Sequence, residues 1–158
     1  LGSGAIMKEV LKAQEMLEQY NIAADVWSVT SYKELHKNAL ETERWNRLNP
    51  TETPRKAFVA EALAEAKGVL VAASDYMKIL PDSLARHLPI PLTSLGTDGL
   101  GRSEGREELR DFFEVDAKHI VLATVKALTD NDMVDVAMVA KAIKDLAIDP
   151  GKVNPYSA

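Results

Sequence analysis

The sequence predicts a single α/β domain over residues 1–158, with a mostly parallel sheet covered by helices on both faces. Three observations predict this class. Short stretches rich in β-branched and apolar residues alternate along the chain with segments of helical periodicity. The stretch VLVAAS, residues 69–74, is almost continuously apolar, which is typical of a strand buried on both faces. No internal repeat, low-complexity stretch or linker divides the chain.

The first elements follow from the glycine turn Gly2-Ser3-Gly4 and the periodic segment after it. The turn is typical of a strand-to-helix joint, yet almost no strand precedes it. We therefore expect that the first strand is truncated and that the chain is a piece of a longer polypeptide. Apolar residues on one helical face predict a helix over 5–20, ended by Asn21. The β-branched stretch AADVWSVTS predicts a strand over 23–31.

The middle of the chain predicts more helix than strand. Residues 31–49 are polar with scattered large side chains and are interpreted as helix and loop. After a break bracketed by two prolines, an Ala-rich helix is predicted over 55–67, closed by Gly68. The strand over 69–74 comes next, and a short helix over 77–88 follows it.

The last third predicts one weak strand and three helices. PLTSLG, residues 91–96, is the weak strand, and a glycine-rich loop leads from it into a helix over 103–113. Two further helices are expected over 116–130 and 132–146, each with an aspartate near its N-cap position. The remaining tail has an irregular pattern.

Composition narrows the function classes. The chain has 158 residues, 46% of them hydrophobic and 27% charged, as in soluble globular domains. Its formal net charge is −5, and no basic stripe with interleaved aromatics occurs, so nucleic acid is not an expected main partner. The longest apolar stretches are too short to cross a membrane. Because there is no cysteine, disulfides, thiolate zinc sites and a cysteine nucleophile are excluded.

The loop GTDGLGRSEG, residues 96–105, resembles a phosphate-binding loop only superficially. A dinucleotide fingerprint needs G-x-G-x-x-G, but Gly99 and Gly101 are followed by Gly105, one residue too late. No G-x-x-x-x-G-K-[ST] motif is present either. The loop is therefore interpreted as a structural joint in which glycine allows a positive φ and a close backbone approach. If Gly101 has a positive φ, Gly101→Val should destabilise the domain.

Polar residues of this loop complete the expected joint. Ser103 is expected to cap the following helix. Asp98 and Arg102 are interpreted either as a bracing ion pair or as contacts to another surface.

Other chemistry-bearing residues give weaker signals. Ser74 and Asp75 follow the buried strand, where sites of α/β proteins lie, but no G-x-S-x-G elbow surrounds the serine. His119 lies among apolar residues and is interpreted as a core or boundary residue rather than as a metal ligand. Arg44 and Trp45 belong to an alternating charged stretch, which is either a solvated face or an interface anchor.

Several blocks together resemble one family. They are DVWSVTSYKEL, ERWNRLNPTETPR, SDYMK, LGTDGLGRSEGREELRDFFEVDAKHIV and KVNP, in that order and over nearly the whole chain. They resemble the C-terminal domain of the homodimeric bacterial type of pyruvate dehydrogenase E1, in the transketolase-like superfamily. The alternatives are another thiamine-dependent E1, a transketolase-like enzyme, or a free-standing nucleotide- or anion-binding module.

The resemblance implies that the chain is part of a larger enzyme whose catalytic site lies in other domains. It implies a three-domain subunit that uses thiamine diphosphate and Mg²⁺, decarboxylates pyruvate and passes the acetyl group to the lipoyl group of the E2 partner. It also implies a homodimer in the bacterial cytoplasm. The residues that bind the cofactor and metal belong to the first two domains, so no catalytic, cofactor-binding or metal-binding residue is expected in this chain. The expected role is structural, with these interface or joint candidates: Arg44, Trp45, Asp98, Gly99, Gly101, Arg102 and Ser103.

Overall fold

A parallel sheet forms the centre of the computed structural model, which describes all 158 residues. Strands β1 (Leu70–Ala73) and β2 (Leu92–Leu95) pair in parallel, with Leu70 opposite Leu92. Beside β1, Gly2 makes parallel bridges both to Ala73 and to Ser28. The sheet therefore has the order Ser28, Gly2, β1, β2, and all of its pairings are parallel, which confirms the predicted fold class.

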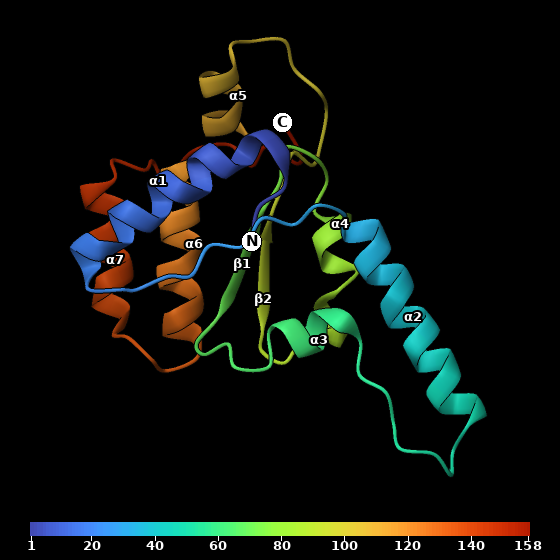
Figure 1. Cartoon of the computed structure of the whole chain (residues 1–158). Coiled ribbons are helices and arrows are strands. Elements are labelled where there is room, and N and C mark those ends of the chain that lie inside the picture. Colours follow the sequence, from blue (N-terminus) through green and yellow to red (C-terminus); the bar gives the residue numbers. More distant parts are fainter.

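One face of the sheet is covered by α1 (Met7–Leu17), α6 (Ala117–Asp130) and α7 (Val136–Asp145) (Figure 1). Helices α1 and α6 pack on each other, and α7 packs on α6. The core on this face combines one side of the strands with the inner sides of these helices. Its members include Ile6, Val10, Leu17, Ala73, Val115, Ile120, Val121 and Val125.

The other face carries α2 (Tyr32–Leu48), α3 (Phe58–Ala62) and α4 (Ile79–Asp82). A second core joins them to the opposite side of the strands, through Tyr32, Ala39, Ala57, Val59, Leu63, Leu70 and Leu84. Figure 1 shows the far end of α2 projecting away from the sheet, with residues 49–57 returning along it. Both faces of the sheet are thus covered by helices, as predicted.

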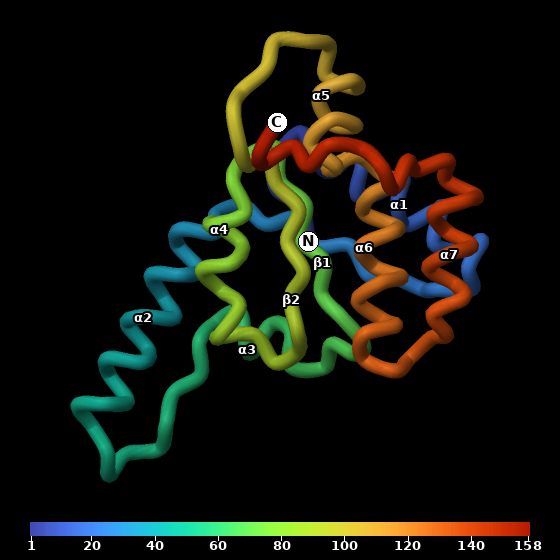
Figure 2. Tube along the Cα trace, turned by 180° about the vertical axis from the view of Figure 1, so that it is seen from behind, coloured from blue at the N-terminus to red at the C-terminus, as the bar shows by residue number.

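Helix α5 (Arg106–Phe112) lies beyond the carboxyl ends of the strands, at the end of a long loop from β2. Seen from behind, in Figure 2, the C-terminal tail passes across the same end of the sheet. Short 3₁₀ helices occupy the remaining turns, at Gly4–Ile6, Glu18–Tyr20 and Ala85–His87.

Local signals in the sequence set several helix ends. Asn21 ends the first helical segment in the left-handed region, with φ 56°. Asp116 caps α6 by accepting a hydrogen bond from the His119 amide, and Asp135 caps α7 by accepting one from Ala137. The structure has no helix long and apolar enough to span a bilayer.

Several predicted elements differ in the structure. The helix expected over 77–88 is divided into α4 and the 3₁₀ turn Ala85–His87, and the helix expected over 132–146 begins at Val136, because Asp135 rather than Asp132 is its N-cap. The strand expected over 23–31 is extended but has only the bridge at Ser28. The helix expected over 55–67 is limited to Phe58–Ala62; a turn follows at residues 63–65, and Gly68 has φ 81°. The helix expected from Ser103 begins at Arg106 instead.

Candidate functional site

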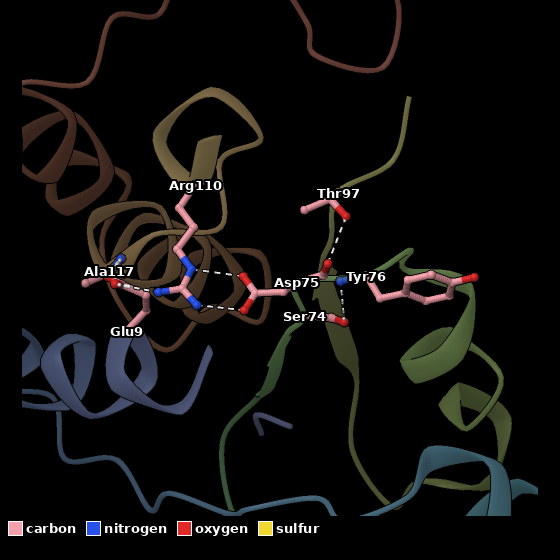
Figure 3. A network of polar contacts seen from close by, with 7 residues as sticks. All are labelled: Glu9, Ser74, Asp75, Tyr76, Thr97, Arg110 and Ala117. Carbon is pink, nitrogen blue, oxygen red and sulfur yellow. Dashed lines mark hydrogen bonds and ion pairs between the residues drawn. The ribbon is translucent and has the colours of Figure 1, made fainter. Parts of the chain in front are cut away.

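A network of charged side chains lies at the carboxyl ends of the strands, where ligands bind in many α/β folds (Figure 3). Asp75, directly after β1, accepts two hydrogen bonds from the Arg110 guanidinium of α5, at 2.9 and 2.6 Å. The third nitrogen of Arg110 donates to Glu9 of α1 at 3.1 Å. The second oxygen of Glu9 accepts from the Ala117 amide at the start of α6. Arg110 of α5 therefore connects the end of β1 to α1, and Glu9 extends this connection to α6.

The polar groups of this network bind one another, so its role is structural. Arg110 is only 6% exposed, and all three of its guanidinium nitrogens are engaged within the chain, so it has little capacity left for an anionic ligand. The hydrogen bonds to Asp75 raise the pKa of Arg110 above its ordinary value. Ser74 is buried and its hydroxyl accepts from the Tyr76 amide, which orders the turn after β1. Sequence reasoning placed Asp75 at this edge but missed Glu9 and Arg110, since their partners are distant in sequence.

The glycine loop makes its close approaches at two positions. A Cβ on Gly96 would lie 2.6 Å from the Tyr76 carbonyl oxygen. Gly99 has φ +108°, and a Cβ there would lie 2.6 Å from the carbonyl oxygen of Pro155 in the C-terminal tail. Gly101 differs, because its φ is not positive and a Cβ would meet nothing within 4 Å. Gly101 therefore lacks the positive φ on which the expected effect of Gly101→Val depends, and Gly99 has the positive φ instead.

Gly99→Ala is expected to lower the free energy of unfolding by about 1–2 kcal/mol, through the left-handed backbone and the clash with Pro155. Gly101→Ala is the matched control, two residues away in the same loop, and should change stability by less than about 0.5 kcal/mol. Urea denaturation of both variants measures the difference. Equal losses at the two positions would contradict the assignment of the joint to Gly99.

The polar residues of the loop make other contacts than those expected. Asp98 accepts a hydrogen bond from the Lys78 amide at 3.1 Å and lies 4.0 Å from the Lys78 ammonium. Arg102 stacks over the Phe112 ring, 4.3 Å from its centroid. The proposed Asp98–Arg102 ion pair is therefore absent. Ser103 is exposed and does not cap α5, because the N-cap of that helix is Gly105, two residues further along, and the helix begins at Arg106.

A polar pocket of about 600 Å³ lies between this loop and α5. Arg102 and Arg106 line it, and neither forms an ion pair with a carboxylate of this chain. Both residues are exposed. The pocket can therefore receive an acidic group from outside the domain. Its other lining residues include Asp75, Thr97, Gly99, Gly101 and Glu104.

The Arg44 and Trp45 candidates lie near the far end of α2. Trp45 is half-buried, and the guanidinium over its ring at 3.7 Å belongs to Arg55 in the returning loop. Arg44 is exposed and has no ion pair. The structure thus uses the tryptophan to hold the loop against α2, and an interface role for both residues stays a prediction.

One cluster of possible metal ligands consists of Asp111, Asp116 and His119. Side chains of the chain itself already contact both carboxylates. The Lys118 ammonium lies 2.5 Å from Asp111 and lowers the pKa of that carboxyl. The His119 ring contacts Asp116 at 2.6 Å, and the histidine is 6% exposed, in keeping with the prediction of a core position. A nitrogen ligand and an occupied carboxylate do not suit Mg²⁺, which prefers oxygen.

An apolar groove of about 450 Å³ opens beside Leu1. Its walls are residues 22–27 on one side and 65–71 on the other, and α1 and α6 form its floor. The Leu1 ammonium lies at one end, where it donates to the Val71 carbonyl oxygen at 2.6 Å. Burial lowers the pKa of this ammonium to about 6. Sequence reasoning did not find the groove.

Comparisons with known proteins point to one family. Residues 1–116 match the model of the transketolase-like C-terminal domain. The chain is 45% identical over 157 residues to the pyruvate dehydrogenase E1 component of Pseudomonas aeruginosa, and 43% identical over 160 residues to that of Escherichia coli K12. These alignments cover 98% and 100% of this chain but only 18% of each relative.

A solved structure supports the fold. A split-gene transketolase, described as an inactive β4 tetramer, superposes with a TM-score of 0.56 at 23% identity. The superposition covers 81% of this chain and 38% of that one. It shows a shared arrangement of strands and helices.

Proposed function

The chain belongs to the family of transketolase-like C-terminal domains, and from this we propose that it is the C-terminal domain of a three-domain pyruvate dehydrogenase E1 subunit. The observation that carries the proposal is the identity of 40–45% with bacterial E1 components along essentially the whole chain. Because the chain spans 18% of those relatives, the remaining domains belong to the rest of the subunit. The whole subunit is a homodimeric oxidoreductase of pyruvate metabolism in the bacterial cytoplasm.

In this proposal the whole enzyme decarboxylates pyruvate oxidatively and transfers the acetyl group to the lipoyl group of E2, within a multienzyme complex. Thiamine diphosphate with Mg²⁺ supplies the carbanion stabilisation that decarboxylation needs. The residues of this chain do not fit that cofactor. In its acidic cluster Asp111 is paired with Lys118 and Asp116 is held by the His119 ring, and the guanidinium of Arg110 is engaged by carboxylates. In the proposed enzyme the catalytic residues lie in the other domains, and the role of this chain is non-catalytic.

The proposed role of the chain is to build the dimer and to hold the domains together. In the loop that contains Asp98, Gly99 and Arg102, Asp98 accepts a hydrogen bond from the Lys78 amide, and the backbone of Gly99 packs closely on Pro155. Arg102 and Arg106 lie at the surface and have no ion pair within the chain. Such groups are suited to carboxylates of another domain or of the second subunit.

A graft tests the proposal. This chain replaces the corresponding C-terminal region of the Escherichia coli E1 component, to which it is 43% identical. We expect a homodimer with pyruvate turnover within about tenfold of the parent enzyme, since the chemistry resides elsewhere. A parent enzyme truncated before this region is the control. A well-folded graft without activity would refute the proposal.

The chain alone is expected to bind no thiamine diphosphate and to have no pyruvate decarboxylase activity. The reason is that the resemblance places the cofactor-binding residues in the other two domains, and the cluster of possible metal ligands in this chain is occupied by Lys118 and a histidine nitrogen. Isothermal titration calorimetry with thiamine diphosphate and MgCl₂ measures binding. A saturable heat signal would contradict this expectation.

Arg102→Ala is expected to weaken dimerisation or domain docking in the full-length enzyme, with little effect on the isolated domain. In the isolated domain the substitution removes only the stacking of Arg102 on Phe112, which at an exposed site contributes about 0.5–1 kcal/mol to the free energy of unfolding. Thermal melting of the domain and sedimentation of the full enzyme measure the two effects. A normal dimer with sharply reduced cofactor affinity would show instead that the loop reaches the active site.

A further inference from the structure

The C-terminal tail, residues 149–158, passes across the end of the sheet where α5 and the glycine loop lie (Figure 2). These two segments form the pocket that Arg102 and Arg106 line. We propose that Lys152 of the tail is a positioning residue for that pocket: it holds the Phe112 ring and thereby sets the guanidinium of Arg102 where an acidic group of a partner binds it. The partner is the neighbouring domain or subunit of the function proposed above, on which this identification rests.

Two cationic side chains approach the same aromatic ring of α5. The Arg102 guanidinium lies 4.3 Å from the centroid of Phe112, and the Lys152 ammonium lies 5.8 Å from it. Both distances are within the range of about 6 Å over which a ring face attracts a cation. The same ring meets buried Phe113 edge-on, with 5.0 Å between the two centroids. Phe112 therefore connects the glycine loop and the tail to the core.

Lys152 is itself held in place at the end of α5. Its ammonium donates to the carbonyl oxygen of Asp111 in the last turn and lies 3.9 Å from the Glu114 carboxylate. The last carbonyls of a helix have no partner within the helix, so the lysine satisfies one of them. Only 23% of the Lys152 side chain is exposed, whereas the paired lysines on α6 and α7 are more than half exposed. Lys152 is therefore part of the fold rather than a solvated surface lysine.

The backbone of the tail is ordered on both sides of Lys152. Before it, the Asp149 carbonyl oxygen accepts a hydrogen bond from the Lys152 amide at 3.2 Å. After it, Pro155 packs on Gly99, where a Cβ on the glycine would lie 2.6 Å from the proline carbonyl oxygen. The tail therefore contacts the glycine loop directly as well as through the Phe112 ring.

A restrained Arg102 binds an acidic group at a lower entropic cost than a mobile one. Arginine is among the side chains that lose the most rotamer freedom when they are immobilised. Arg102 is exposed and has no ion pair within the chain, so its stacking on Phe112 restrains the guanidinium before a partner arrives. Arg106 lines the same pocket from the first turn of α5, and two guanidinium groups suit a carboxylate. Lys152 thus contributes to docking without touching the partner.

Substitutions of Lys152 in the 158-residue chain test the proposal. The side-chain proton resonances of Arg102 report its stacking, because the ring current of Phe112 shifts them upfield. Phe112→Leu removes the ring, keeps both charges and supplies the unstacked reference. We expect Lys152→Met to move these resonances toward that reference. Lys152→Arg, which keeps a cation over the ring, should retain the parent values.

Citrate, a compact tricarboxylate, probes the pocket itself. We expect saturable binding to the parent chain by NMR titration, with a dissociation constant that Lys152→Met and Phe112→Leu raise about three- to tenfold. That range corresponds to the cost of immobilising one long side chain on binding. Lys152→Arg should bind like the parent. Lys126→Met on α6 is the control for the loss of one positive charge, and it should also bind like the parent.

Three results would overturn the proposal. They are unchanged Arg102 resonances in Lys152→Met, unstacked resonances in Lys152→Arg, and no saturable binding of citrate to the parent chain. All of these measurements use the 158-residue chain alone. Their failure is therefore distinguishable from a failure of the graft that tests the proposed function.

Discussion

Replacing Arg110 with alanine is expected to lower the free energy of unfolding by about 3 kcal/mol, because the substitution leaves two carboxylates without their shared cation. Asp75 and Glu9 both depend on this guanidinium, and Glu9 also holds the first amide of α6. Asp75 is partly exposed, so water takes over part of its solvation and limits the loss. Urea denaturation monitored by circular dichroism measures the effect.

Arg106→Ala is the matched control for this experiment. It removes the same charge from the same helix, but Arg106 is exposed and has no ion pair. Its cost should be below about 0.5 kcal/mol. Arg110→Lys should have an intermediate effect, since an ammonium keeps the charge but cannot form the two-pronged contact with Asp75. Equal losses for Arg110→Ala and Arg106→Ala would show that net charge matters rather than the network.

Ala72→Asp is expected to abolish cooperative folding, with a cost above about 4 kcal/mol. Ala72 is 0% exposed in the middle of β1, opposite Ser94 of β2. A carboxylate there has no partner and no room. The expected result is loss of the near-ultraviolet circular dichroism signal and of a sigmoidal melting transition. Ala85→Asp, at an exposed position, is the control and should melt like the parent.

Val71→Asp refines the same test. The sequence pattern of VLVAAS predicts burial on both faces, and Leu70, Ala72 and Ala73 are all buried. Val71 is only half-buried, because its side chain borders the groove beside Leu1. Its substitution should therefore destabilise the domain less than Ala72→Asp. A melting temperature unchanged from the parent at either position would contradict the placement of β1 at the centre of the sheet.

Elements whose signals are local could be predicted from the sequence. The capping aspartate of α6, the left-handed Asn21 and the apolar run of β1 each act within a few residues, and all appear in the structure. The strand expected over 23–31 fails as a defined strand for a different reason. It has the alternating burial of a strand, but a ladder needs a neighbouring backbone, which only Gly2 supplies.

The candidate site could be predicted only in part. The position of Asp75 after β1 follows from the strand pattern. Its partner Arg110 lies 35 residues away on a short helix whose charged sequence is typical of an exposed surface. In the loop, Asp98 and Arg102 are close in sequence, but Asp98 binds the Lys78 amide and Arg102 stacks on the Phe112 ring. Sequence spacing does not determine which side chains meet across a tertiary contact, and glycine content alone does not reveal which glycine has a positive φ.

The hydrogen bonds of Glu9 can form only late in the synthesis of the chain. They join α1 to Arg110 and to the Ala117 amide across 101 and 108 positions of the chain. The apolar side of α1, with Val10, Ala13 and Leu17, packs mainly on α6. At typical translation speeds, α1 leaves the ribosome on the order of ten seconds before α6 exists. During that interval its apolar side can pack only on residues already made, such as Ile22, Val26 and Ala73, and its largest contact surface, α6, is still missing.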